Sequence, residues 1–327
     1  MILVTGATGF VGSALVRLLL ERGEPVRVLV RPGSDRQNLV GLDLEIAEGD
    51  LLKPETLKPA VAACTGLYHV AADYRLWTRD PKKMLEANVE GSQAIIRAAA
   101  DAGVERMVYT SSVATLGIVN GGVADEETPV TYADMIGVYK QSKYKAEQAV
   151  QRLVSDQGAP VVIVNPSTPI GPRDIKPTPT GRMIVEAAAG RMPAYVDTGL
   201  NIAHVDDVAA GHLLAYDKGR IGERYILGGE DMELSQILAH IAHLMNRKPP
   251  RIKIPHNAIL PIAYLAEAWT RLSGGDDPFV VVDGVKMAKK KMYFSSDKAK
   301  QALGYQARPA VEALNDAVEW FQAEGYF

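Results

Sequence analysis

The feature that most constrains this fold is a glycine-rich turn near the start of the chain. Residues 5–12 read TGATGFVG, with glycines at positions 6, 9 and 12. An apolar run at residues 2–4 precedes the turn, and residues 12–22 have the apolar spacing of a helix. Glycine permits a tight turn, and a helix N-terminus attracts negative charge. A strand, this turn and a helix therefore predict a phosphate-binding βαβ unit.

The glycine spacing is G-x-x-G-x-x-G, which differs from the G-x-G-x-x-G dinucleotide fingerprint. Glycines alone would also fit a plain turn between a strand and a helix. Because the strand and the helix flank them directly, we predict dinucleotide binding. The cofactor-binding residues expected in the turn are Gly6, Thr8, Gly9, Phe10, Val11 and Gly12.

Short apolar runs alternate with helical patterns through the first half of the chain. The runs lack polar alternation, as is typical of strands buried on both faces, and helical patterns at 84–102 and 135–155 lie between them. Strands are expected at residues 2–4, 26–30, 67–70, 107–110 and 161–164. The rhythm predicts an α/β fold with a Rossmann-type doubly wound parallel sheet.

The pattern changes after Asn165. Residues 166–179 contain five prolines and are expected to form a loop, because proline fixes φ and donates no backbone hydrogen bond. A strand-like run at 224–227 lies among helical patterns. Helices are expected at residues 181–190, 205–217, 234–246, 256–272, 295–303 and 309–323. The second half is therefore predicted to form a smaller, mainly helical domain that covers the sheet.

The end of the second expected strand bears on which nicotinamide nucleotide binds. Chains that prefer NAD often place Asp or Glu there, against the ribose hydroxyls. Here Val30 is followed by Arg31, and Arg36 lies close behind. A guanidinium binds a 2′-phosphate, which a carboxylate would repel. The charges favour NADP(H), with NAD(H) as the alternative, although Arg31 would also suit an exposed strand end.

The stretch GVYKQSKYKAE, residues 137–147, contains two tyrosines and three lysines within seven positions. Projection at about 100° per residue places Tyr139 and Lys143 on the apolar stripe. Lys140 and Lys145 fall off this stripe and are expected to be solvated. An inward lysine can be a snorkelling side chain, but a tyrosine one turn earlier favours a functional pair.

The pair suggests acid–base chemistry. A cation one turn away favours a phenolate, so Lys143 is expected to lower the pKa of Tyr139. A positioned phenol then exchanges a proton with a hydroxyl or carbonyl during hydride transfer. Ser111 or Ser112, directly after the strand expected at 107–110, would orient the substrate oxygen at the carboxyl edge of the sheet.

Several motifs together resemble the extended short-chain dehydrogenase/reductase family. They are TGATGFVG, GDL at 49–51, HVAA at 69–72, NVEG at 88–91, YTSS at 109–112, YKQSK at 139–143 and HVDDVA at 204–209. The resemblance covers nearly the whole chain and implies that Ser112, Tyr139 and Lys143 are catalytic. It implies cofactor contacts from Asp50, Leu51, Ala71, Ala72, Asn88, Tyr139, Lys143, Pro166 and Thr168.

The resemblance also implies two interleaved domains. Residues 1–167 plus 203–228 would bind NADP, and residues 168–202 plus 229–327 would bind substrate. The stretches AADYRLW at 71–77 and KKKMYFSS at 289–296 are most similar to hopanoid-associated sugar epimerases, which are close relatives of dihydroflavonol reductases. That subgroup implies a sugar-like or lipid-linked small-molecule substrate in hopanoid biosynthesis.

Three functions remain open. The leading hypothesis is an NADP(H)-dependent oxidoreductase acting on a carbinol or ketone, with Tyr139 as acid–base group. The alternative is an epimerase that transiently oxidises a nucleotide-sugar or lipid-linked sugar. Val113 and Ala114 follow Ser112 where a dehydratase usually has an acidic pair, so a dehydratase is disfavoured. The third hypothesis is a non-catalytic protein that senses NADP.

Substrate contacts are expected on the far side of the cofactor. Tyr74 and Trp77 follow a strand end and would stack on a ligand or fill a domain interface. Arg173 and Arg182, in or beside the proline-rich segment, would bind an anion or solvate the loop. His204 with the two acids after it resembles a metal site only superficially, and no metal is predicted.

Composition limits the partners and the compartment. A net charge of −3 gives no global basic field for nucleic acid. One cysteine, Cys64, excludes an intrachain disulfide, and with no leader before MILVTGATG this predicts the cytoplasm. Lysines at 286–291 beside the apolar run 256–269 would fit peripheral membrane contact or a homodimer.

Overall fold

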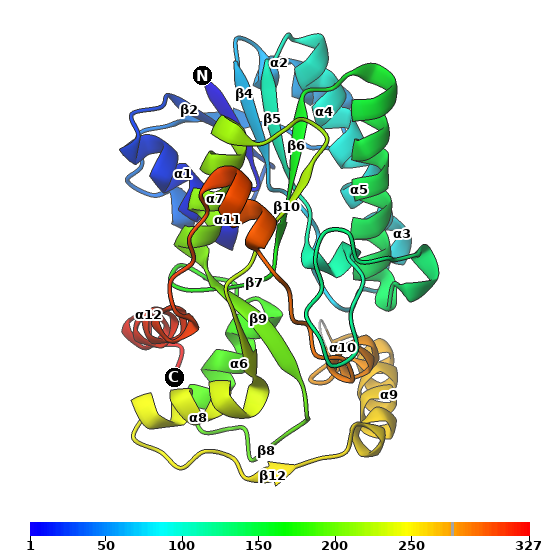
Figure 1. Ribbon diagram of the computed structural model, residues 1–327, viewed down its shortest axis with the longest axis vertical. Coiled ribbons are helices and arrows are strands. Elements are labelled where there is room, and N and C mark those ends of the chain that lie inside the picture. Colours follow the sequence, from blue (N-terminus) through cyan, green and yellow to red (C-terminus); the bar gives the residue numbers. More distant parts are fainter. Residues whose placement is uncertain (276–277) are drawn as a thin grey trace.

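The computed structural model describes residues 1–275 and 278–327. Its centre is a seven-stranded parallel sheet in the order β10-β6-β5-β4-β1-β2-β3 (Figure 1). The strands are β1 (Ile2–Thr5), β2 (Val26–Val30), β3 (Glu45–Glu48), β4 (Gly66–His69), β5 (Arg106–Thr110), β6 (Val161–Pro166) and β10 (Arg224–Leu227). The predicted doubly wound α/β fold is confirmed.

Successive residues of the central strands are buried on opposite faces of this sheet. Val4 belongs to a core under α1 (Phe10–Glu21) and α7 (Val205–Lys218), whereas Leu3 belongs to a core on the other face. The second core lies under α2 (Leu57–Val61), α4 (Gly91–Asp101) and α5 (Gly137–Gln157). Burial on both faces explains why these strands read as continuous apolar runs.

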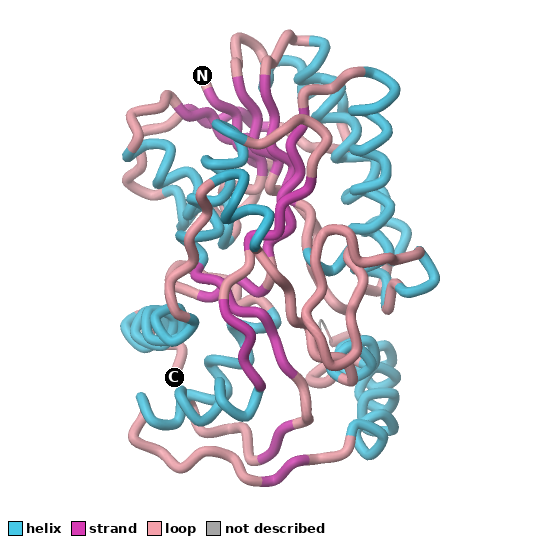
Figure 2. The backbone as a smooth tube through the Cα atoms, in the orientation of Figure 1, coloured by secondary structure: helices cyan, strands magenta, loops and turns pink. Residues whose placement is uncertain are grey.

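A second group of elements lies at the other end of the molecule (Figure 2). Its three-stranded sheet has the order β11-β9-β7, and a two-stranded sheet pairs β12 with β8. These strands are β7 (Thr168–Ile170), β8 (Ala194–Tyr195), β9 (Gly199–His204), β11 (Glu230–Glu233) and β12 (Ile252–Lys253). Helices α6 (Pro179–Ala188), α8 (Leu234–Leu244) and α12 (Ala310–Ala323) share a core with this sheet.

The remaining helices are short connections or outer layers. They are α3 (Pro81–Leu85), a π-helical turn (Glu86–Glu90), α9 (His256–Ser273), α10 (Val282–Ala288) and α11 (Asp297–Leu303). Single 3-10 turns lie at Gln37–Leu39, Pro54–Thr56, Val113–Thr115 and Tyr132–Asp134. None of the helices in the described ranges combines the length and apolar character that a bilayer crossing requires.

The proline-rich segment 166–179 was expected to be all loop, and this is wrong at both ends, where Pro166 ends β6 and Pro179 begins α6, and for a short strand between them. Thr168–Ile170 pair with β9 as the edge strand β7, with Pro169 in the middle. An edge strand tolerates proline because one of its sides needs no ladder hydrogen bond. Farther on, β10 returns to the large sheet beside β6. This return of the chain to the large sheet supports the proposed division into two interleaved domains.

Candidate active site

The glycine turn between β1 and α1 has no room for side chains at two of its positions. Gly6 has φ of +73°, and a Cβ there would lie 2.6 Å from the backbone nitrogen of Ala71. A Cβ on Gly12 would clash with the carbonyl oxygen of Gly6. The turn therefore packs backbone against backbone, which explains why glycine occupies these positions.

The same region has the features that a dinucleotide needs. A Cβ on Gly9 would meet only the Gly6 carbonyl oxygen, at 3.3 Å, so it would otherwise project into open space. No side chain caps the N-terminus of α1, which leaves backbone amides to bind a phosphate. At the end of β6, the buried hydroxyl of Ser167 has no partner within the described chain. These residues fit a nicotinamide dinucleotide.

The expected adenosine end of the site lies at the ends of β2 and β3. Val30 is buried and Arg31 is exposed, while Arg36 forms an ion pair with Glu48. Asp50 is half-buried and accepts a hydrogen bond from the Leu52 backbone at 3.0 Å. Arg31 is thus available to a phosphate, whereas Arg36 already has an acidic partner.

Ser112, Tyr139 and Lys143 lie together at the carboxyl edge of the large sheet. Ser112 follows β5, and its hydroxyl lies close enough to the Tyr139 phenol, in the first turn of α5, to oppose the rise of the phenol pKa. One turn later, Lys143 Nζ donates to the Thr110 carbonyl oxygen at 2.8 Å. The ammonium also lies 5.1 Å from the centre of the Tyr109 ring. The arrangement suits proton exchange with a substrate oxygen.

The pKa of Tyr139 differs from the sequence prediction. Burial raises the pKa of this phenol, and the nearby Ser112 hydroxyl only partly opposes the shift. Lys143 does not lower the pKa of Tyr139, since the pKa of Lys143 itself is lowered to about 8 and the amine is mostly neutral where the phenol ionises. Burial also lowers the pKa of Lys143 to about 8, against the opposing effect of Glu147. The expected lowering of the Tyr139 pKa is therefore wrong for the protein alone.

A second layer of buried polar groups fixes the serine loop. The carboxylate of Glu147 accepts hydrogen bonds from Ser111, from Thr115 at 2.9 Å and from Asn165 at 2.8 Å. Asn165 also donates to the Ser112 carbonyl oxygen at 3.0 Å, and the single proton of the Thr115 hydroxyl is shared between Glu147 and that carbonyl oxygen, 2.8 Å away. Each of these bonds restricts the backbone that carries the Ser112 hydroxyl.

Arg224 from β10 is the cation of this layer, 3.2 Å from the Glu147 carboxylate. Sequence reasoning did not identify Glu147, Asn165 or Arg224. One signal was present: Glu147 lies one turn beyond Lys143, so an acid occupies the inward side of the same helix. Its partners come from distant strands, and no local spacing marks them.

Lys140 was expected to be solvated, and this is wrong. Its side chain is only 4% exposed, whereas Lys145 is exposed as expected and lies 4.7 Å from the centre of the Tyr132 ring. Burial lowers the pKa of Lys140 to about 8, and the nearby cation Lys290 adds to this shift. The cause is tertiary, because residues near the C-terminal end of the chain pack over this side of α5.

Other residues predicted to contact the cofactor lie around the loop after β4. Asn88, in the π-helical turn, accepts from the Asp73 backbone at 2.7 Å and donates to Ser142 on α5 at 2.8 Å. The backbone of Ala71 donates to Thr5 at 3.2 Å. Asn88 thus connects this loop to the helix that carries Tyr139. The cofactor contacts of Leu51, Ala72, Pro166 and Thr168 stay predictions.

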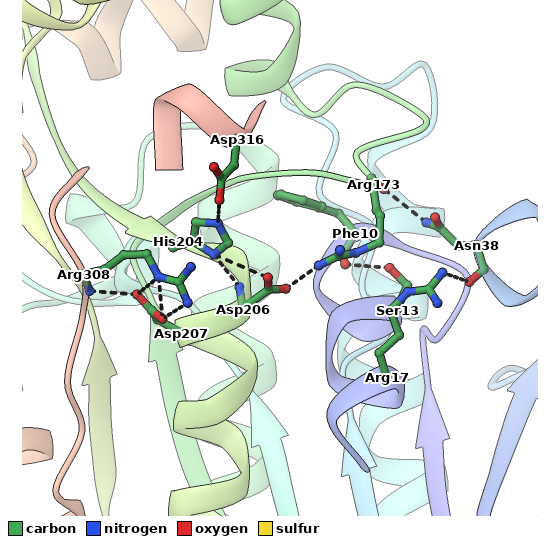
Figure 3. Close-up of polar contacts among 10 residues, drawn as sticks. All are labelled: Phe10, Ser13, Arg17, Asn38, Arg173, His204, Asp206, Asp207, Arg308 and Asp316. Atoms are coloured by element: carbon green, nitrogen blue, oxygen red, sulfur yellow. Dashed lines mark hydrogen bonds and ion pairs between the residues drawn. The ribbon is translucent and has the colours of Figure 1, made fainter. Parts of the chain in front are cut away.

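The substrate-side residues are dispersed. Tyr74 is 42% exposed, whereas Trp77 is 8% exposed with its indole nitrogen unpartnered in the described structure. Arg173 forms an ion pair with Asp206 beside α1 (Figure 3). Arg182 lies exposed at the start of α6. Their roles in substrate binding stay predictions, and Arg173 would have to leave Asp206 to bind an anion.

His204 connects β9 to α7 and α12 (Figure 3). Its Nδ1 accepts from the Asp206 backbone at 3.0 Å, and its Nε2 lies 3.0 Å from the carboxylate of Asp316. Asp207 binds Arg308 through several hydrogen bonds, one of 2.7 Å. Across the described ranges, no three His, Cys, Asp or Glu residues are grouped to hold a metal ion. The HVDD motif at residues 204–207 therefore caps the N-terminus of α7 and connects this helix to Arg308 and to Asp316 of α12.

Comparison with known proteins agrees with this geometry. The model of the NAD dependent epimerase/dehydratase family matches residues 2–228. A relative from Synechocystis sp. that is named as a dihydroflavonol 4-reductase is 47% identical, over 99% of this chain and 95% of the relative. Sterol demethylase protein B of Methylococcus capsulatus is 36% identical, over 99% of this chain and 98% of the relative.

Among solved structures, the protein gox2253 is similar throughout. Its crystal structure is 54% identical in sequence to this chain and superposes with a TM-score of 0.90. The match covers 100% of this chain and 99% of that one. The similarity includes both the large sheet and the second group of elements.

Proposed function

Because this chain belongs to the NAD dependent epimerase/dehydratase family, we propose that it transfers hydride between NADP(H) and a carbinol or ketone. Membership makes the chain an NAD(P)-dependent epimerase or reductase, and argues against a non-catalytic sensor. The observation that carries the finer proposal is the group formed by Ser112, Tyr139 and Lys143 at the sheet edge. The nucleotide, when bound, supplies or accepts the hydride.

Each of the three residues has a separate task in this proposal. The Ser112 hydroxyl donates to the substrate oxygen and holds it beside the phenol. In reduction, the Tyr139 hydroxyl gives its proton to that oxygen as the carbonyl carbon gains the hydride; in oxidation, the proton returns. The Lys143 ammonium stabilises the phenolate and would hold the nicotinamide ribose. Glu147 keeps the serine loop in position through Thr115 and Asn165.

The test of this proposal is a Tyr139→Phe variant. The variant keeps the ring and removes the proton, so NADPH oxidation with an active ketone should fall by about 10²- to 10⁴-fold. Nucleotide binding, followed by fluorescence titration, should stay within about threefold of wild type. Unchanged turnover would refute the assignment of Tyr139 as the acid–base group.

The preference for NADP(H) over NAD(H) is supported by the exposed Arg31 after the buried Val30. The family name mentions only NAD, so this preference is our proposal. Mass spectrometry of the nucleotide that co-purifies with the protein would identify it directly. An Arg31→Glu variant should weaken NADPH binding and leave NADH binding unchanged.

An epimerase is the second candidate, because the matching family includes epimerases. Such an enzyme would retain its nucleotide and return the hydride to the other face of a sugar-like substrate. Net NADPH consumption with ketones favours the reductase; conversion of a sugar without consumption favours the epimerase. The relative named sterol demethylase protein B supports a polycyclic, hopanoid-like or lipid-linked substrate over a free sugar.

The proposed substrate domain carries an exposed apolar face on α9. Ile262 is 48%, Leu265 71%, Trp269 71% and Leu272 85% exposed. Lys286 and Lys289 are exposed nearby on α10 and directly after it, so peripheral contact with an anionic membrane from the cytoplasm is our proposal, with a homodimer as the alternative. Flotation with anionic vesicles and sedimentation analysis would separate the two.

A further inference from the structure

Asn38 is a buried amide at a point where three segments of the chain meet (Figure 3). The residue lies after β2 and is 4% exposed. Both hydrogen bonds of its amide nitrogen leave its own segment, because Nδ2 donates to the Thr8 carbonyl oxygen and to the Arg173 carbonyl oxygen, each at 3.2 Å. Since both acceptors are carbonyl oxygens, the amide must turn its nitrogen toward them. Asn38 therefore joins the glycine turn to the loop that follows β7.

The hydrogen bond to Thr8 completes a set of satisfied carbonyls in the glycine turn. The Gly6 carbonyl oxygen accepts from the Gly9 backbone at 3.0 Å, and the Gly9 carbonyl oxygen accepts from the Ser13 backbone at 2.9 Å. The Ser13 hydroxyl donates to the Phe10 carbonyl oxygen at 2.9 Å. Of these four carbonyls in the described structure, the Thr8 carbonyl alone takes its donor from a distant segment.

The direction of the Thr8 oxygen matters for an anion. A pyrophosphate binds to backbone N–H groups, and a carbonyl oxygen that faced it would repel it. The hydrogen bond from Asn38 holds the Thr8 oxygen toward the segment after β2, whereas the amides at the start of α1 have no side-chain cap. Because the peptide unit is planar, the same bond also fixes the orientation of the Gly9 N–H, which closes the turn.

The second carbonyl belongs to a residue in an uncommon conformation. Arg173 has φ of +76°, which is unfavourable for a residue with a Cβ unless its surroundings hold it. Asn38 binds its carbonyl, and Asp206 forms an ion pair with its guanidinium. The next residue, Asp174, is buried and accepts from the backbone and the hydroxyl of Thr178, at 2.9 Å and 2.8 Å. The amide that fixes the glycine turn thus also fixes the start of the loop 171–178.

The segment that contains Asn38 has anchors that do not involve the Asn38 side chain. Leu39 is buried in the core under α1, and Arg17 of α1 donates to the Asn38 carbonyl oxygen at 3.1 Å. On the surface, the Asp35 carboxylate lies 3.7 Å from the ammonium of Lys176. Loss of the amide would therefore leave this segment in place and release the two carbonyls that it binds.

We propose that Asn38 is a positioning residue for the nucleotide, which holds the glycine turn in the form that binds a pyrophosphate and connects this turn to the loop at Arg173. The inference rests on the proposed binding of NADP(H) and adds to it a residue from outside the turn. A bound nucleotide then orders the loop 171–178 of the proposed substrate domain through Asn38.

The test compares two ligands that share one end. NADP⁺ contains the pyrophosphate, whereas adenosine 2′-monophosphate would occupy only the adenosine end beside Arg31. Asn38→Leu keeps a branched side chain without its donors and without adding a charge. Calorimetric titration of this variant should show at least about tenfold weaker binding of NADP⁺, and binding of adenosine 2′-monophosphate within about threefold of wild type. Equal weakening of both ligands, or unchanged binding of NADP⁺, overturns the proposal.

Two further variants support this comparison. Asn315→Leu changes an exposed position on α12 and should bind both ligands as wild type does. If circular dichroism shows that Asn38→Leu does not reach the wild-type fold, the smaller Asn38→Ala replaces it, with the same expected difference between the ligands. If the wild type binds NAD⁺ instead of NADP⁺, the compared ligands are NAD⁺ and adenosine.

Amide hydrogen exchange, followed by mass spectrometry, tests the connection to Arg173. Saturating nucleotide should slow exchange in the loop 171–178 of wild type about threefold or more, and this effect should be absent from saturated Asn38→Leu. The glycine turn should be protected in both proteins. No protection of the loop in wild type, or equal protection in both proteins, overturns the connection.

These outcomes do not depend on turnover. The proposed hydride transfer fails if Tyr139→Phe remains fully active, whereas the role of Asn38 fails on binding and exchange alone. An enzyme with intact Tyr139 chemistry and unchanged NADP⁺ binding in Asn38→Leu would retain the proposed function and lose this inference.

Discussion

Two regions of α5 each bury a lysine, and they differ in what surrounds it. Lys143 is 3% exposed and donates to the Thr110 carbonyl, with the Glu147 carboxylate raising its pKa. Lys140 is 4% exposed, and its charged neighbour is the cation Lys290. Burial lowers the pKa of both to about 8. The first region gives its lysine an acceptor and an acid, whereas the second brings another cation close to its lysine.

This difference shows how the helix divides its tasks. The Lys143 region faces the large sheet, where strand ends supply carbonyls and the second layer supplies an acid. The Lys140 region faces the segment around α10, which brings the cation Lys290 close to Lys140 and the carboxylate of Asp283 against Gly137. The protein therefore fixes its reacting groups on the side of α5 that faces the large sheet. Four substitutions would break or sharpen this comparison.

The largest effect is expected from Lys143→Met. Loss of the ammonium removes the group that would hold the nicotinamide ribose beside Tyr139 in the proposed reaction, so kcat/KM should fall about 10²- to 10⁴-fold. NADPH oxidation with an active ketone measures this, and circular dichroism verifies the fold. If Lys143→Met and Lys140→Met had the same kcat, the division between the two regions would be wrong.

Glu147→Gln should produce the next largest effect. The change leaves the half-buried Arg224 without its acid, and the free energy of unfolding should fall by about 2 kcal/mol. Activity should fall as well, because an amide oxygen replaces the charged acceptor that Ser111, Thr115 and Asn165 share, and the amide NH₂ cannot accept. Urea titration measures the first effect.

The exposed acid Glu319 on α12 provides a matched control. Glu319→Gln should change the free energy of unfolding by less than about 0.5 kcal/mol. A Glu147→Gln variant as stable as this control would show that the second layer does not hold the site together.

Lys140→Met should stabilise the protein, because it removes a charge that both burial and the nearby cation Lys290 disfavour. At pH 7 we expect a gain of roughly 1–3 kcal/mol in the free energy of unfolding. The pKa of Lys140 is lowered to about 8 in the fold, from 10.5. The penalty is therefore complete below pH 8 and is relieved as pH rises toward 10.5, where the unfolded chain binds more protons.

The measurement is the difference between wild type and Lys140→Met in urea titrations at pH 7 and near pH 10. The advantage of the variant should shrink at the higher pH. An advantage that is constant with pH would mean that packing of the Met side chain, rather than charge, causes it.

Lys145→Met should have the smallest effect. Lys145 is exposed and contributes a cation–π contact, 4.7 Å from the centre of the Tyr132 ring. Such contacts stabilise exposed sites by about 0.5–1 kcal/mol at most. The same titration should show a loss within that range, with activity at the wild-type level. A larger loss would indicate that the Tyr132 contact orders the start of α5.

Strands could be predicted from the sequence where nearly all residues of the segment are buried and the segment therefore reads as a continuous apolar run. Strands β2 and β10 were predicted with their observed bounds, since both read as apolar runs. Strand β3, with the sequence EIAE, was missed because it is an edge strand with mostly exposed side chains. Strand β7 was missed because Pro169 argued against any strand, and only its pairing with β9 makes one there.

The site could be predicted as far as one helix describes it. Tyr139 and Lys143 share an inward stripe, and helical spacing is sufficient to find them. Lys140 lies off that stripe, and residues about 140 positions later in the chain bury it, near Asp283 and Lys290. The spacing of residues within α5 cannot predict this contact with a segment so far along the chain. The direction of the Tyr139 pKa was missed for the same reason, since burial depends on the whole fold.

The ion pair between Glu147 and Arg224 has a consequence for synthesis of the protein. The two residues are 77 positions apart, and β10 is the last strand to join the large sheet. A nascent chain that has not yet reached Arg224 contains Glu147 without its cation and β6 without its outer neighbour. The serine loop can thus be fully ordered only after β10 has been made, at a stage when α8 and α12 of the second group have still to be synthesised. A chain that ended before Arg224 would keep the glycine turn and the helix of Tyr139 and Lys143, and would lack the cation of the layer that holds Ser112.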